Sequence, residues 1–430
     1  MKGKKLYTSL IIVSLMAFGM GSYIFKAYNK EKAVINKENE DLEGEIVFVS
    51  NRTDKKEELS NLILEFEELH PKTKIKLELI GDVGEVLERR AMLQELPDVT
   101  LVPGAIKVSE YDKYFIPIDD LEFTDENIYN YITGLGGDGK LYNLNTSISW
   151  RGIIYNKEVF KEAEINDVPR TQEEFFKVCE TLKEKGITPF IVNYKQAWTM
   201  GPWIDIAAYL FNENLENDVM VENKDILSDS SGVFKALNFV RDIVQNGYAE
   251  ENLLSSEWQQ SKNDIKDGKA AMVFLDSNFK FQLEDAGMDK EHIGIFPLPG
   301  STLVRAYGDY KIGIAKNTEY PEVAKAFLKF IFEEDRYAKA VNIASPLKNN
   351  NSNKDLIKEL EVYNIPIDFP GNTASKQSKE EVAMHEKYDT LRRLSGLDYS
   401  FVQDYITTND VEGLRNKMNN NWNELEVQQD

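Results

Sequence analysis

Polar and aromatic side chains next to the ends of apolar segments are the residues of this chain best suited to bind a ligand. Asn51 and Arg52 directly follow EIVFVS, and Trp150 and Arg151 directly precede GIIY. Trp198 lies in AWTMGPW, a loop marked by Gly and Pro. Ligands of open α/β sheets bind outside the carboxyl ends of the strands. Rings and polar groups placed there suit an amphipathic ligand, although each Trp could instead pack in or cap the core.

Residue types that would indicate catalysis or metal binding are sparse. His70, His292 and His385 are far apart and lack zinc-ligand spacing. GLGGDG has the glycine spacing of a dinucleotide fingerprint, but it does not join a strand to a helix, so we expect a turn and no cofactor. No nucleophile elbow, phosphate-binding loop or EF-hand motif is present. The sequence predicts a binding protein and not an enzyme, although its many carboxylates leave a glycosidase pair open.

Length and charge narrow the range of partners. The chain has 430 residues, 42% of them hydrophobic, and a net charge of -22. That length favours two compact lobes over one. The charge would repel nucleic acid, because such binding depends on neutralising phosphates with Lys and Arg. The single cysteine, Cys179, excludes an intramolecular disulfide and is expected to pack inside a helix as a small hydrophobic residue.

The N-terminus carries an export pattern. Three lysines in the first five residues precede an apolar run from Leu6 to Phe25. A run of about 20 residues can cross a bilayer as a helix, and the basic start favours an orientation with the bulk of the chain outside. We expect residues 1–30 to be a retained membrane anchor and residues 31–43 a polar tether. Cleavage near Ser22 is the alternative.

The remaining chain alternates short β-branched segments with amphipathic helices. EIVFVS, IKLELI and DVTLVPG are expected strands, separated by a helix that ends before Pro71 and by a helix through VGEVLERRAMLQELP. The same alternation returns between GIIYNKEVF and PEVAKAFLKFIF. This order is typical of mostly parallel sheets covered by helices, so the sequence predicts an α/β fold with two such units.

These segments, in this order, resemble the extracellular solute-binding proteins of ABC importers, specifically the sugar-binding, maltodextrin-binding-like family. The resemblance covers about residues 44–335, and YNKEVF, GITPF and DGKAAM are its most specific parts. It implies a two-lobed periplasmic-binding-protein-like fold with a hinge and an interlobe ligand cleft, which closes over the ligand. Lobe 1 is expected to contain residues 44–149 and 311–348, and lobe 2 residues 150–310 and 349–430.

The resemblance also implies ligand-binding positions. They are Asn51, Arg52, Ser149, Trp150, Trp198, Asp276, Asn278, Phe279, Asp309 and Tyr310. Two places depart from the family pattern: Asn278 stands where a stacking aromatic is usual, and Asp309 and Tyr310 stand where small residues are usual. Arg52 and Arg151 could equally bind a carboxylate or phosphate, so the residues leave the ligand class open between a sugar and an anion.

The predicted function is an extracytoplasmic receptor that delivers an oligosaccharide or glycoside to the permease of an ABC importer. The alternatives are a sensing protein of the same fold that feeds a membrane signalling partner, and an exported carbohydrate-active enzyme. Members of the family usually end the apolar run with a lipid-bearing cysteine, whereas Gly21 and Ser22 stand there in this chain. We therefore expect no lipoprotein, but a chain held by its N-terminal helix at the extracellular face of the cytoplasmic membrane.

Overall fold

The computed structural model describes residues 42–81, 83–205, 207–211, 225–255, 257–349, 358, 360–368, 387–388 and 390–427. Residues 1–30 and nearly all of 31–43, the expected anchor and tether, lie outside this part of the chain. Within the described ranges, no helix combines the length and the apolar character needed to cross a membrane.

Contacts between residues divide the chain into two units, which are described separately. The first contains the described residues up to Ile106, together with Asp112–Leu121 and Gly313–Val341. The second contains Lys107–Tyr111, Glu122–Ile312 and the described residues from Asn342 onward.

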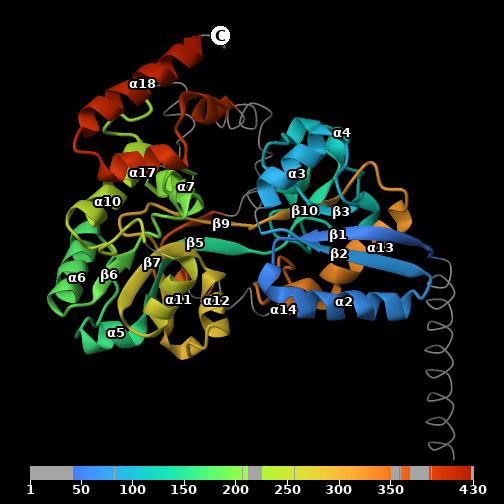
Figure 1. Ribbon diagram of the computed structural model, residues 1–430, viewed down its shortest axis with the longest axis horizontal. Helices are drawn as coiled ribbons and strands as arrows, with labels where there is room; N and C mark the ends of the chain where they lie inside the picture. Colours follow the sequence, from blue (N-terminus) through green and yellow to red (C-terminus); the bar gives the residue numbers. More distant parts are fainter. Residues whose placement is uncertain are drawn as a thin grey trace, which may run out of the picture. The chain divides into compact units, whose positions relative to one another are not determined.

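The first unit contains four neighbouring strands of one sheet, in the order β2-β1-β3-β10 (Figure 1). The bounds of its strands are β1 (Gly44–Ser50), β2 (Thr73–Leu79), β3 (Val99–Leu101) and β10 (Lys311–Ile314). β1 pairs in parallel with both β2 and β3, which confirms the strands predicted from EIVFVS, IKLELI and DVTLVPG. The parallel order follows because each strand is separated from the next by a helix.

The helices of the first unit are α2 (Lys56–Leu69), α3 (Val83–Met92), α4 (Tyr111–Tyr114), α13 (Pro321–Phe332) and α14 (Arg336–Val341). α2 buries Leu59, Leu62, Ile63 and Phe66, which lie three or four residues apart on one face of the helix. Leu69, which follows the same spacing, is exposed at the end of the helix. The ring of Phe66 meets that of Phe327 edge-on at 5.2 Å, so α2 and α13 share one core. Each such buried side chain contributes about 1.5–3 kcal/mol to folding.

The sheet of the second unit has the order β11-β9-β5-β7-β6, and β8 also pairs with β5. The bounds are β5 (Ser149–Asn156), β6 (Thr188–Ile191), β7 (Ala270–Asp276), β8 (Ile293–Phe296), β9 (Val304–Tyr307) and β11 (Ile367–Asp368). β5 is antiparallel to β7, β8 and β9, while β6 and β7 are parallel. This sheet is therefore mixed, because β5 enters it in the opposite direction, whereas the sequence predicted mostly parallel strands.

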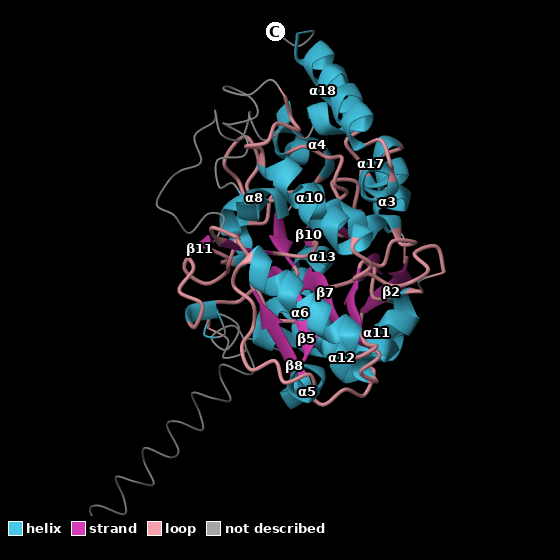
Figure 2. Cartoon of the chain, turned by 90° about the vertical axis from the view of Figure 1, so that its left-hand side faces the viewer, coloured by secondary structure: helices cyan, strands magenta, loops and turns pink. Residues whose placement is uncertain are grey.

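Helices flank the strands in Figure 2, where strands are magenta and helices cyan. Those of the second unit include α5 (Lys157–Glu162), α6 (Gln172–Glu184), α7 (Gly201–Asp205), α8 (Ala207–Phe211), α10 (Gly232–Gln245), α11 (Trp258–Lys266), α12 (Phe279–Asp285), α17 (Tyr399–Thr407) and α18 (Val411–Val427). α6 starts at a capping box in which Thr171 and Glu174 satisfy each other's backbone N–H groups. Cys179 is buried on its inner face, as predicted.

GLGGDG forms a turn, as its context predicts. The N–H of Gly136 donates to the carbonyl of Lys140 at 2.8 Å, and that of Gly139 donates to the carbonyl of Gly136 at 2.9 Å. Gly139 has a φ of 81°, a value that favours glycine. The segment opens no helix, so it lacks the N–H array that would hold a pyrophosphate.

The lobe boundaries expected from the resemblance differ from the observed division. Residues 107–111, 122–149, 311–312 and 342–348 belong to the second unit, although the sequence assigned them to the first lobe. The backbones of 122–149 and 342–348 are joined, since the N–H of Tyr129 donates to the carbonyl of Pro346 at 2.8 Å and that of Ile148 to Ala344 at 3.1 Å. Pairing over such sequence separations leaves no local pattern, so the sequence alone did not reveal it.

Candidate ligand-binding site

Several predicted site residues gather at one end of the sheet in the second unit. Asp276 is the last residue of β7, and Trp198 follows the parallel strand β6 after a short loop. Arg151 of β5 pairs with Asp276, and Ser149 pairs with Tyr307 at the end of β9. The carboxyl ends of β6, β7 and β9 and the start of β5 therefore meet at one edge, where ligands bind in open α/β sheets.

A polar network joins these strand ends. The Arg151 guanidinium donates from Nη2 to Oδ2 of Asp276 at 2.6 Å and from Nε to the hydroxyl of Tyr307 at 2.9 Å. Tyr307 in turn donates to Oδ2 of Asp276 at 3.1 Å, and the Ser149 hydroxyl donates to Oδ1. Asp276, at the end of β7, thus accepts from side chains of β5 and β9, and its carboxylate links the ends of these three strands.

Charge in the network is balanced within the protein. The side chains of Arg151 and Asp276 are 11% and 22% exposed, so water screens their attraction weakly. Burial alone would lower the pKa of Arg151, but the neighbouring phenol and carboxylate outweigh it and raise that pKa above its usual range. Burial raises the pKa of Tyr307, which stays a neutral hydrogen-bond donor. The buried Nη1 nitrogen of Arg151 has no hydrogen-bond partner among the described residues.

Asn278 holds backbone segments together instead of offering a stacking surface. Its Oδ1 accepts from the N–H of Ala344 at 3.1 Å, and its Nδ2 donates to the hydroxyl of Ser147 at 3.4 Å. The same hydroxyl accepts from the N–H of Asp309 at 3.3 Å. Asp309 is exposed, and the carbonyl of Tyr310 accepts from the N–H of Thr146 at 2.7 Å. This departure from the family pattern has a structural reason, since the amide joins three segments.

Trp150 and Phe279 lie in the core of the second unit. The Trp150 side chain is fully buried, and its backbone N–H donates to the hydroxyl of Ser277 at 3.2 Å. A Cβ at Gly152 would lie only 2.4 Å from the Trp150 ring, so glycine is what lets this ring lie against β5. Phe279 is 2% exposed. Both rings therefore pack in the core. The network is formed by Ser149 and Arg151, the residues on either side of Trp150.

Trp198 and Phe279 are joined by an aromatic residue that the sequence did not single out. The ring of Trp258, the first residue of α11, meets that of Trp198 edge-on at 4.9 Å and lies tilted against that of Phe279 at 5.2 Å. The ammonium group of Lys262 lies 5.0 Å from the Trp258 ring. Trp198 is 47% exposed and presents the open end of this row. The sequence order could have indicated Trp258. Because α11 directly precedes β7, the start of the helix lies near the end of the strand, where Asp276 is.

Asn51 and Arg52 belong to the first unit, after the carboxyl end of β1. Arg52 binds Asp54 through two hydrogen bonds, from Nε at 2.9 Å and from Nη2 at 2.8 Å. Its Nη1 donates to the carbonyl of Val341 at 2.6 Å. Burial would raise the pKa of Asp54, but the Arg52 guanidinium outweighs it and lowers that pKa. Asn51 is half-buried, with its carbonyl accepting from the N–H of Thr53.

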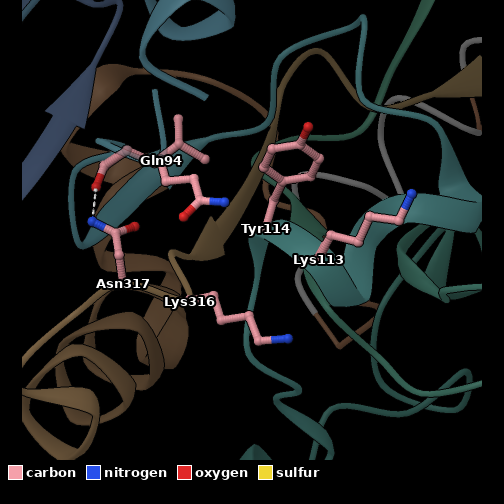
Figure 3. Close-up of a pocket in the computed structure, with 6 residues that line it drawn as sticks. Gln94, Lys113, Tyr114, Lys316 and Asn317 are labelled. Atoms are coloured by element: carbon pink, nitrogen blue, oxygen red, sulfur yellow. Dashed lines mark hydrogen bonds between the residues drawn. The ribbon is translucent and has the colours of Figure 1, made fainter. Parts of the chain in front are cut away.

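Figure 3 shows a second candidate, an open cavity of about 300 Å³ in the first unit. Its lining residues are Gln94, Leu96, Lys113, Tyr114, Lys316 and Asn317. Leu96 precedes β3, so the cavity lies at the opposite end of the parallel strands from Arg52. The ammonium groups of Lys113 and Lys316 point in different directions (Figure 3), and Lys316 donates to the carbonyl of Asp112 at 2.6 Å. These cations do not converge on one ligand position.

Metal binding finds no support in the part of the chain that the structure covers. There, no three His, Cys, Asp or Glu side chains form a group that could hold a metal ion.

Comparison with known proteins identifies relatives of the whole folded region. A multiple sugar-binding protein of Streptococcus mutans is 25% identical over 330 residues, which cover 73% of this chain and 76% of that protein. A mannobiose-bound binding protein of an ABC transporter from Bifidobacterium animalis subsp. lactis has a TM-score of 0.76 at 23% identity, covering 91% of this chain and 96% of that one. A stachyose-bound sugar transporter protein from Bacillus licheniformis has a TM-score of 0.68 at 18% identity, covering 89% of this chain and all of that one.

These structural likenesses confirm the two-lobed α/β fold that the resemblance implied, since proteins of that architecture cover nearly the whole chain. The family model of bacterial extracellular solute-binding proteins matches residues 50–337, which is about two thirds of the sequence. The chain belongs to the bacterial extracellular solute-binding protein family.

Proposed function

We propose that this protein is the carbohydrate receptor of an ABC importer and that its ligand is a neutral oligosaccharide or glycoside. The sugar-binding name of the Streptococcus relative and the mannobiose and stachyose complexes of the structural neighbours support the ligand class. Family membership supports a place outside the cytoplasm and an ABC permease as partner.

Neutrality of the ligand rests on one observation: both arginines that could attract an anion are already paired. Arg52 binds the Asp54 carboxylate with two hydrogen bonds, and Arg151 binds Asp276. An anionic ligand would have to displace these carboxylates or lie beside them, and like charges that close repel. Hydroxyl groups carry no such penalty, because each can donate to a carboxylate and accept from a guanidinium or phenol.

The proposed contacts divide the ligand into polar and apolar parts. Asp276, Arg151 and Tyr307 would bind hydroxyls of the sugar. Trp198 would stack on a C–H face of a sugar ring. The further proposed contacts are Asn51, Arg52, Asp309 and Tyr310. The predicted residues Ser149, Trp150, Asn278 and Phe279 are buried in the second unit and would support the site from behind. Micromolar affinity, about 8 kcal/mol, needs only a few such interactions.

The protein would act by binding alone, with no bond broken in the ligand. Its N-terminal segment would hold it at the outer face of the cytoplasmic membrane, without lipid, because the only cysteine is Cys179. A retained segment predicts that the mature protein still begins near Met1 and sediments with membranes. A mature N-terminus near Ser22 would contradict that anchor.

One experiment separates receptor, anion binder and enzyme. The purified protein is titrated with neutral di- to tetrasaccharides and with the matching uronic acids, while tryptophan fluorescence and product formation are followed together. A receptor of the proposed kind gives saturable fluorescence changes with neutral sugars alone and releases no product. Preference for the uronic acids would contradict the neutral ligand, and turnover would contradict the receptor.

A further inference from the structure

The loop that carries Trp198 starts from a tight backbone turn. β6 ends at Ile191, and η5 (Ala197–Met200), which contains Trp198, begins six residues later. Between them Asn193 has a φ of 54°, in the left-handed region. A residue with this conformation in a turn directs successive backbone N–H groups to one side, and such a group of N–H donors binds anions.

The anion at this turn is the carboxylate of Glu250, which comes from the segment after α10. Its Oε2 accepts from the N–H of Val192 at 2.8 Å, and its Oε1 accepts from the N–H of Tyr194 at 3.4 Å. The segment is anchored beside β6, because the N–H of Phe190 donates to the carbonyl of Tyr248 at 2.9 Å. Glu250 thus bridges two residues of the turn from a fixed position.

The same turn is held on its carbonyl side. Thr199 donates its hydroxyl hydrogen towards the carbonyls of Asn193 at 3.0 Å and Gln196 at 2.7 Å, so the residue next to Trp198 closes the loop on itself. Gln403 of α17 donates to the carbonyl of Tyr194 at 2.6 Å. These hydrogen bonds connect the base of the turn to Thr199, the residue next to Trp198.

We propose that Glu250 is a positioning residue for ligand binding: its carboxylate holds the Val192–Tyr194 turn in the conformation that presents Trp198 to the ligand. The inference rests on the proposed function, in which Trp198 contacts a sugar. Glu250→Gln keeps the size of the side chain but replaces one acceptor oxygen by an NH₂ group, which would face a backbone N–H. The turn must then shift or leave a backbone donor without an acceptor.

The position of Trp198 can be measured without any sugar. The full chain contains five tryptophans, so incorporation of 5-fluorotryptophan gives five fluorine resonances, and Trp198→Phe identifies the one from Trp198. We expect Glu250→Gln to shift or broaden this resonance and to leave that of the buried Trp422 unchanged. Glu251→Gln, at the exposed neighbouring residue, is the matched control and should change neither. A Trp198 resonance that stays in place in Glu250→Gln overturns the inference.

Sugar titrations then test the consequence for binding. Glu250→Gln should weaken the affinity for the best neutral sugar about tenfold, and Glu251→Gln should not. In a Trp198→Ala background the Glu250→Gln substitution should have no further effect, since residues that act through one another are not additive. An equal loss in both backgrounds would contradict positioning.

The test of Glu250 remains possible if the first variant does not fold or if no sugar binds. If Glu250→Gln does not fold, Glu250→Asp retains the charge but shortens the side chain, and the same resonance and titrations apply to it. If the wild-type protein binds no sugar, the proposed function fails, whereas the fluorine spectra still decide whether Glu250 positions Trp198.

Discussion

Asp276 is the residue whose loss should damage the candidate site most. Asp276→Asn removes the carboxylate that accepts from Arg151, Tyr307 and Ser149. The amide that replaces it still offers one acceptor oxygen, but it carries no charge. Arg151, only 11% exposed, is then left charged without its counter-ion.

The cost follows from the burial of this pair. Removing one partner of a buried ion pair costs about 3–5 kcal/mol, because the remaining charge is uncompensated. Asp276 keeps 22% of its side-chain surface exposed, so water partly screens the pair and reduces this cost to about 2–3 kcal/mol of unfolding free energy. Arg151→Met in the Asp276→Asn background removes the stranded charge and should recover at least about 1 kcal/mol.

Urea unfolding followed by tryptophan fluorescence measures this loss of stability in the second unit, which contains Asp276. All five tryptophans, at positions 150, 198, 203, 258 and 422, lie in the second unit, so the signal reports that unit. Asp267→Asn is the control, because its carboxylate pairs with lysines at the surface, and it should cost less than about 0.5 kcal/mol. If Asp276→Asn is as stable as this control, or if the double variant is no more stable than the single one, the reasoning about the network is wrong.

Three further predictions concern ligand contact, packing and reactivity. Trp198→Ala should weaken sugar binding at least tenfold, about 1.4 kcal/mol, with an unchanged urea midpoint; unaltered affinity would remove Trp198 from the site. Gly152→Ala should cost about 1–3 kcal/mol in the urea assay, because its Cβ would lie within 2.6 Å of the Phe296 carbonyl and nearer still to the Trp150 ring. Burial raises the pKa of the Cys179 thiol, so Ellman's reagent should modify it only in urea; rapid reaction of the native chain would contradict its burial.

Local pattern was enough to predict most helices and strands. The helix that ends before Pro71 and the apolar runs of β1 and β2 depend on neighbouring residues only, and all are confirmed. The composition of an apolar run, however, does not determine whether the strand is parallel or antiparallel to its neighbours. For that reason the antiparallel entry of β5 was missed, and with it the mixed character of the second sheet.

The candidate site shows the same limit more sharply. The resemblance supplied Ser149, Asp276 and Trp198, but not Tyr307, which meets Arg151 across 156 residues of sequence. Trp258 and Glu250 were also missed, because each acts on a residue brought near it only by the fold. Sequence reasoning found residues at strand ends, whereas the groups that neutralise or orient them required the structure.

The carbohydrate-receptor account is tested most directly by calorimetric titration of the full chain with neutral oligosaccharides, repeated with Asp276→Asn and Trp198→Ala. The account predicts one saturable site of about micromolar affinity in the wild type. Neutral sugars should bind more tightly than uronic acids, and both variants should bind the neutral sugars much more weakly than the wild type. Wild-type affinity retained in both variants, or heat from anionic ligands alone, would contradict it.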